Sequence, residues 1–289
     1  MTQGTSAARF FTPVAFDFLW ESAGLGEVPY PLRVSSHGAT MDERVALRFR
    51  TEDELRADGV KDTVGGIEPA VEHWLTLLAR APHSVDALFV PELGGQPVAA
   101  IAAADGSGGV LAVQDAEGIR LRPIYPDAAV TEIVDLLPAC RRGTERSITI
   151  SREEAARTAP ARGAHASSVA DEPEEGLASR FGLGLARQSR TRSRPRLSER
   201  TAGDQRADYA RLAGQPRIRG GQLAANARDE FGSRRRSPVL AWFDTDTGRY
   251  LSLTRTGSDG HEWITVSPAD TKTLRSRLAD LTGELSHTR

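Results

Sequence analysis

Two aspartates, Asp244 and Asp246, come closest to a catalytic pattern in this sequence, within the stretch AWFDTDTGRYLSLTR (241–255). Asp246-Thr247-Gly248 matches the loop of aspartic proteases, in which two carboxylates share one proton and divide the acid and base roles. That mechanism needs a second such loop or a symmetric dimer. The chain contains no second Asp-Thr-Gly, so the protease interpretation lacks half of its site.

A phosphatase of the haloacid dehalogenase type also begins with two aspartates after a buried strand, and it then needs a long α/β body downstream. The residues that follow Asp246 predict two strands and one helix instead. The runs PVLAWF and RYLSLTR are rich in β-formers and are joined by Asp, Thr and Gly, which tolerate turn geometry. A β-hairpin is therefore the favoured interpretation, and a hydrolase that uses Asp244 and Asp246 is the weaker alternative.

No other group of residues suggests a reaction. Cys140 lies between a predicted helix end and two arginines that could lower the pKa of its thiol, but no histidine is near in sequence, so an ordinary loop thiol is favoured. The six histidines are scattered without the spacing of a zinc site. DGSGGV lies between two predicted strands and resembles a hairpin turn more than a phosphate loop. We therefore expect no catalytic residue, no metal and no cofactor, and a protein that is not an enzyme.

Composition excludes several classes of protein. The net charge of −2 gives no global attraction to nucleic acid or to a membrane surface. A single cysteine rules out an intramolecular disulfide framework and suits a reducing compartment. No signal pattern begins the chain and no apolar run approaches the length of a membrane span, so we expect a cytoplasmic protein without membrane insertion.

The N-terminal half, residues 1–150, combines helices with strands. Amphipathic helices are predicted around residues 16–23, 41–58 and 69–81, the second with a capping box at Thr40 and a glycine C-cap at Gly59. From Val85 the period changes to that of strands, and four antiparallel strands are followed by the helix DAAVTEIVDLLP and a short strand SITI. Residues 151–200 lose this periodicity and predict a flexible, arginine-rich linker.

The C-terminal half, residues 201–289, repeats the order of the first. A helix leads into four predicted strands, RIRGGQLAANARD, RRRSPVLAWFD, GRYLSLTRTG and HEWITVSP. A last helix is expected to take Ser267 as its N-cap and Pro268 in its first turn. Four strands and a helix thus occur twice, over 85–137 and 217–285. This repeat predicts an α+β fold in which two similar halves meet across one antiparallel sheet, as one composite domain.

Several stretches together resemble the EspG family of ESX (type VII) secretion-associated proteins of actinobacteria. They include LGEVPYPL, GATMDER with ELRADGV, LTLLARAPHSVDALF and IVDLLPACRRGTERSITI. The most specific are IRGGQLAANARDEFGSRRRSPVLAWFDTDTGRYLSLTR and WITVSPADTKTLRSRLADL, because the sheet pattern, the turn and the helix start occur in order. The resemblance covers nearly the whole chain except the linker.

The resemblance implies a central antiparallel β-sheet with quasi-two-fold related halves and flanking helical bundles. It also implies a cytosolic, non-enzymatic chaperone that binds the helical tip of a PE/PPE-like heterodimer, keeps it soluble and targets it for export. As a site hypothesis, Trp242, Phe243, Arg249 and Tyr250 contribute to the contact. The competing explanation makes Trp242 and Tyr250 core residues and pairs Arg249 with Asp244.

The basic part of the linker gives one further alternative. The basic run ARQSRTRSRPRLSER within the linker could bind phosphate backbones. No aromatic residue interleaves with it and the acidic DEPEEG precedes it, so a solvated linker is favoured and no nucleic-acid partner is expected. The sequence does not decide between a monomer and a homodimer.

Overall fold

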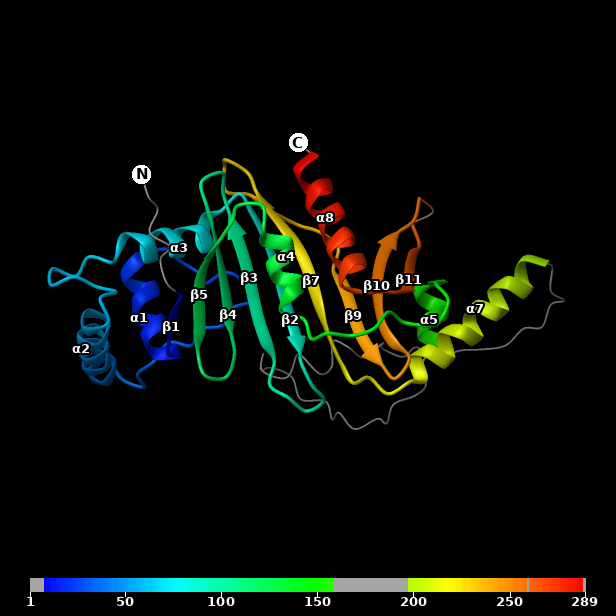
Figure 1. The fold of residues 1–289 in the computed structure, drawn as a ribbon, viewed down its shortest axis with the longest axis horizontal. Coiled ribbons are helices and arrows are strands. Elements are labelled where there is room, and N and C mark those ends of the chain that lie inside the picture. Colours follow the sequence, from blue (N-terminus) through cyan, green and yellow to red (C-terminus); the bar gives the residue numbers. More distant parts are fainter. Residues whose placement is uncertain (1–7, 159–196, 259, 288–289) are drawn as a thin grey trace. The chain divides into compact units, whose positions relative to one another are not determined.

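The computed structural model describes residues 8–158, 197–258 and 260–287 (Figure 1). The chain divides into two compact units that are interleaved in sequence. The first unit takes residues 1–140, 219–241 and 271–289, and the second takes residues 141–218 and 242–270. The predicted halves, 1–150 and 201–289, do not coincide with these units, because each unit contains segments from both halves.

Three helices lie near the start of the first unit, and the capping signals predicted for the second of them are confirmed. They are α1 (Pro13–Ala23), α2 (Met41–Ala57) and α3 (Pro69–Arg80). At the start of α2 the Thr40 hydroxyl accepts a hydrogen bond from the Glu43 N–H, while the Glu43 carboxylate accepts from the Ala39 N–H. Beyond its end Gly59 has a φ of 68°, the left-handed conformation that glycine adopts without steric cost.

The sheet of the first unit is antiparallel throughout, with the strand order β1-β5-β4-β3-β2-β7-β8. Its strands are β1 (Arg9–Phe11), β2 (His83–Val90), β3 (Val98–Ala104), β4 (Gly109–Gln114), β5 (Ile119–Ile124), β7 (Arg219–Arg228) and β8 (Arg234–Arg236). The four predicted strands β2 to β5 are confirmed. Strand β1 was not predicted, because three residues show no alternation and their pairing with β5 depends on contacts distant in sequence.

Helices cover both faces of this sheet. On one face, buried residues of α1 and α3 pack with alternate residues of β3, β4 and β5, such as Ile101, Val110 and Leu121. The intervening residues Ala100 and Leu111 are equally buried. They belong to the face that α4 (Ala129–Asp135) and α8 (Thr271–His287) cover, as Figure 1 shows for the strands β2, β3 and β7.

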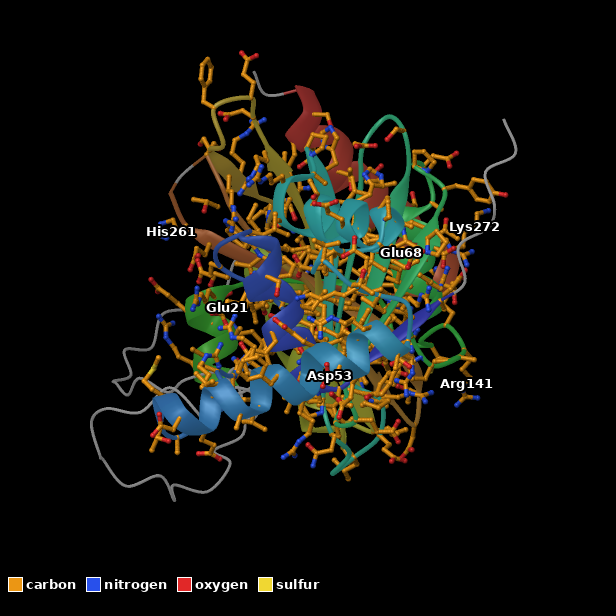
Figure 2. All side chains as sticks on the ribbon, turned by 90° about the vertical axis from the view of Figure 1, so that its left-hand side faces the viewer. Glu21, Asp53, Glu68, Arg141, His261 and Lys272 are labelled. Atoms are coloured by element: carbon orange, nitrogen blue, oxygen red, sulfur yellow. The ribbon has the colours of Figure 1, made fainter. Side chains whose placement is uncertain are left out.

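Helices α1 and α2 are joined by an ionic network. Asp17 accepts hydrogen bonds from the His37 N–H at 2.8 Å and from the Arg44 guanidinium at 3.0 Å. One turn further along α1, Glu21 accepts from Arg44 and, at 2.6 Å, from Arg48. Figure 2 views this end of the first unit with α2 in the foreground and labels Glu21 on α1. Burial raises the pKa of the Asp17 carboxyl, but the hydrogen bonds from Arg44 and His37 outweigh it and hold the pKa below its ordinary value of 3.8.

Replacing Asp17 with Asn is expected to lower the free energy of unfolding at pH 7 by about 1.5–3 kcal/mol, the range for a hydrogen bond to a charged group. A carboxyl whose pKa is lower in the folded state stabilises the fold above pH 3.8, and this contribution is lost as the pH falls through the folded-state value. Urea denaturation at pH 7 and at decreasing pH should therefore show the two proteins converging in acid. Asp53→Asn, at an exposed position of α2 (Figure 2), is the control. An equal loss in both variants, or a difference that persists in acid, would contradict this role of Asp17.

The second unit contains four antiparallel strands in the order β9-β10-β11-β6, with β9 belonging to it from Trp242 onward. They are β6 (Ile148–Ser151), β9 (Leu240–Thr245), β10 (Gly248–Thr256) and β11 (Glu262–Pro268), accompanied by the helices α5 (Arg152–Thr158) and α7 (Leu197–Gly214). Residues of α7, Tyr209 and Leu212, pack in one core with Ile148, Phe243 and Val266 of the strands. The α+β class with an antiparallel sheet is thus confirmed, while the quasi-two-fold relation of the halves stays a prediction.

Three predicted boundaries need correction. The linker predicted over 151–200 is shorter, because α5 and the start of α7 lie inside that range; the residues between them lie outside the described part of the chain. Ser267 and Pro268 belong to β11, paired with Leu251 and Tyr250, so α8 begins only at Thr271. The predicted strand RRRSPVLAWFD is two strands, β8 and β9, because Pro238 between them has no N–H to donate.

Candidate functional site

The stretch with Asp244 and Asp246 is a hairpin turn between β9 and β10. Strand β9 ends at Thr245 and β10 begins at Gly248, whose φ of 114° is a conformation that glycine favours. The Thr247 N–H donates to the Thr245 hydroxyl at 3.2 Å, which closes the turn locally. Asp244 is fully buried whereas Asp246 is exposed. The two carboxylates therefore do not form the shared acid–base pair that a protease needs.

Asp244 is one half of a buried ion pair. Arg249 donates from Nε to Oδ1 of Asp244 at 2.7 Å and from Nη2 to Oδ2 at 2.9 Å, and each side chain is 1 % exposed. The guanidinium also stands 4.5 Å from the centre of the Trp242 ring. Both carboxylate oxygens are thus occupied by a fixed cation, so Asp244 has a structural rather than a catalytic environment.

The aromatic residues of the hairpin lie in the interior of the second unit. Phe243 and Tyr250 stack with ring centres 5.6 Å apart, and the Arg217 guanidinium is 4.8 Å from the Phe243 ring. The Tyr250 hydroxyl accepts a hydrogen bond from the Glu145 N–H at 3.1 Å. The exposed fractions are 1 % for Trp242, 8 % for Phe243 and 0 % for Tyr250. The explanation that made Trp242 and Tyr250 core residues and paired Arg249 with Asp244 matches this geometry.

Residues 141–144 hold the start of β10 from one side. The Arg249 N–H donates to the Arg141 carbonyl at 2.9 Å, and the Gly143 N–H donates to the Arg249 carbonyl at 3.0 Å. A Cβ at Gly143 would come within 2.5 Å of the Tyr250 ring, so only glycine fits there. The Arg141 guanidinium donates to the Asp246 carbonyl at 2.6 Å. The exposed turn is therefore fixed on a closely packed base.

The part of the chain that the structure describes contains no group of three or more His, Cys, Asp or Glu residues that could hold a metal ion. The arrangement nearest to a nucleophile and base is Lys61, whose Nζ donates to Ser22 Oγ at 2.7 Å. The Ser22 hydroxyl donates in turn to the Phe18 carbonyl at 2.7 Å, so its proton is held by the helix and not passed to the lysine. This contact joins α1 to the residues after α2 and is structural.

Comparison with known proteins decides the family. The model of the EspG family matches residues 12–280, nearly the entire chain. The chain belongs to the EspG family. Among solved structures, it is similar to the Mycobacterium tuberculosis type VII secretion system chaperone EspG5, determined in complex with a PE25–PPE41 dimer. The TM-score is 0.63 with 95 % of each chain covered, and at 14 % identity this similarity shows a shared fold. No curated protein is matched by the sequence.

This EspG-family chain also exposes apolar side chains that the sequence did not single out. Met41, Val45 and Phe49 recur every four residues on α2 and are 74 %, 47 % and 67 % exposed. In the second unit Trp263 of β11 is 38 % exposed. Their helical spacing predicts that Met41, Val45 and Phe49 share one face of α2. An apolar helix face normally packs inward, so the exposure of these side chains could not be predicted from the pattern. No described helix has the length and apolarity to cross a membrane.

Proposed function

We propose that this EspG-family protein is a chaperone of type VII secretion that binds the helical tip of a PE/PPE-like heterodimer, keeps it soluble and targets it for export. The observation that carries the proposal is the family match over residues 12–280. The fold shared with EspG5 over 95 % of each chain supports it, because that protein was captured with a PE25–PPE41 dimer. Binding before export places the protein in the cytoplasm.

The proposed activity is binding without catalysis. A secreted helical hairpin carries an exposed apolar end, and a partner that covers it needs a surface of about 800 Å² on each side and no reactive group. The hairpin carboxylate Asp244 is held by Arg249, which suits a structural role. Exposed apolar residues such as Phe49 and Trp263 are of the kind that a client surface would bury.

Within the predicted contact region, we assign the four hairpin residues a positioning role. Trp242, Phe243, Arg249 and Tyr250 are buried, so they act on a client by holding the exposed turn at Asp246. Asp246→Arg reverses the charge of that turn without touching the core, and it is expected to weaken client binding about tenfold if the turn lies in the contact. Glu27→Arg, an equal charge change at an exposed loop position, is the control.

The function is tested by the solubility of a client. A PE/PPE-like pair should be expressed with and without the chain, and the soluble fraction should be measured after centrifugation. The proposal expects the pair to be largely insoluble alone and several-fold more soluble with the chain. An unchanged soluble fraction beside a well-folded chain would refute the chaperone assignment for that client class.

A further inference from the structure

The first unit contains a cavity of about 240 Å³ between the end of α3 and the hairpin of β7 and β8. Its apolar lining includes Leu78 and Ile101, with the Tyr30 ring beside them. Arg228, Arg234, Arg235 and Arg236 also line it, and the Arg235 guanidinium donates to the Leu285 carbonyl at 2.7 Å. A partly apolar cavity lined by several arginines is an uncommon arrangement, because like charges repel one another and favour separation in solvent.

One of these arginines already has a counter-ion. Arg236 forms a two-pronged ion pair with Asp86, at 2.5 Å and 2.8 Å, and Asn226 donates to the same carboxylate at 2.7 Å. Asp86 is fully buried beneath the hollow. The Arg236 guanidinium also stands 4.9 Å from the centre of the Tyr30 ring, which fixes it as part of the wall. Its charge is used to compensate Asp86 and not to attract a ligand.

Arg228 and Arg234 differ from Arg236 in this respect. They face each other across the β7–β8 ladder, and within the described residues neither forms an ion pair. The nearby Asp229 carboxylate accepts from the N–H groups of Phe231 and Ser233 and serves the turn. Burial lowers the pKa of the Arg228 guanidinium, and the charges of Arg234 and Arg80 lower it further. The unit thus holds clustered positive charge that a bound anion would stabilise.

We propose that this cavity is a binding site for an acidic polypeptide segment, which places a carboxylate against Arg228 and Arg234 and an apolar neighbour against Leu78 and Ile101. Arginine suits this role because its planar guanidinium binds carboxylates in two-pronged geometry. The apolar wall favours a side chain over a free inorganic anion, which would leave that wall uncovered. The inference rests on the cavity alone and does not depend on the proposed function.

The test uses the full chain and a short fluorescent peptide of alternating leucine and glutamate, followed by anisotropy. The variant Arg228→Gln/Arg234→Gln removes two charges from the cavity while it keeps an unbranched polar side chain at each position. The control Arg50→Gln/Arg146→Gln removes two charges from exposed positions elsewhere. We expect the cavity variant to weaken binding about tenfold or more and the control to change it less than about twofold.

A second peptide in which glutamine replaces glutamate, and inorganic phosphate as a competitor, separate the possible sources of binding. The proposal expects little binding of the glutamine peptide and weak competition by phosphate. Equal binding of both peptides, or equal losses in both arginine variants, would overturn it. Strong binding of phosphate with no binding of the acidic peptide would also overturn it, because the site would then hold a free anion.

Discussion

Replacement of Arg249 with Met is expected to destabilise the chain by about 3–5 kcal/mol, the cost of leaving one member of a buried ion pair without its partner. Asp244 is fully buried, and both of its oxygens accept from Arg249. Met fills a similar volume and therefore isolates the loss of charge from the loss of packing. The free energy of unfolding should be measured by urea denaturation, with hydrogen exchange of β9 and β10 locating the change.

The matched controls for this variant are Arg146→Met and the double variant Arg249→Met/Asp244→Leu. Arg146 is exposed, so its replacement should change stability by less than about 0.5 kcal/mol. The double variant removes the unpaired charge together with its partner and should recover most of the loss. A loss below about 1 kcal/mol for Arg249→Met, or a double variant no more stable than the single one, would contradict the proposed role of the pair.

The second large effect concerns Asp86 in the first unit. Within the described residues, Arg236→Met leaves this carboxylate with Asn226 as its side-chain hydrogen-bond partner, and a loss of about 3 kcal/mol is expected near neutral pH. Burial already raises the pKa of the Asp86 carboxyl above its ordinary value of 3.8, while Arg236 and Asn226 oppose that rise. Removing Arg236 takes away the main opposing interaction, so the pKa in the variant rises further.

The direction of the pH effect follows from this shift. An acid with a higher pKa in the folded state binds more protons when folded than when unfolded, so stability falls as the pH rises from 3.8 through the folded-state value. The deficit of Arg236→Met relative to the parent chain should therefore be smaller near pH 5 than near pH 8. Arg234→Met, in the same strand and exposed, is the control. A deficit that does not change with pH would show that Asp86 stays ionised in the variant or gains another partner.

Local signals in the sequence predicted much of the fold. The cap at Thr40, the left-handed glycine after α2 and the Asp-Thr-Gly turn are each set by neighbouring residues, and the structure has all three. The features that the sequence did not predict depend on contacts between residues that are distant in the chain. Strand β1 exists because β5 offers a free edge, and Ser267 stays in a strand because Leu251 pairs with it, although its sequence suits a helix cap.

The candidate site was less predictable for the same reason. The composition of the hairpin fitted either a surface that contacts a client or a part of the protein core. The packing of β10 against residues 141–144 goes with the burial of Trp242 and Tyr250. The arginine cavity joins α3 to β7 and β8, which are far apart in the chain. Its counter-ion, Asp86, lies among the apolar residues of the buried part of β2, and a charged residue within that apolar run was the available signal.

The most direct test of the central claim is co-purification with a client. The tagged chain should be co-expressed with PE/PPE-like pairs and analysed by size-exclusion chromatography with light scattering. We expect a stable complex of the chain with one heterodimer, which elutes earlier than the chain alone. A chain that elutes alone as a well-folded species, with every soluble PE/PPE-like pair tested, would contradict the assignment to PE/PPE-like clients.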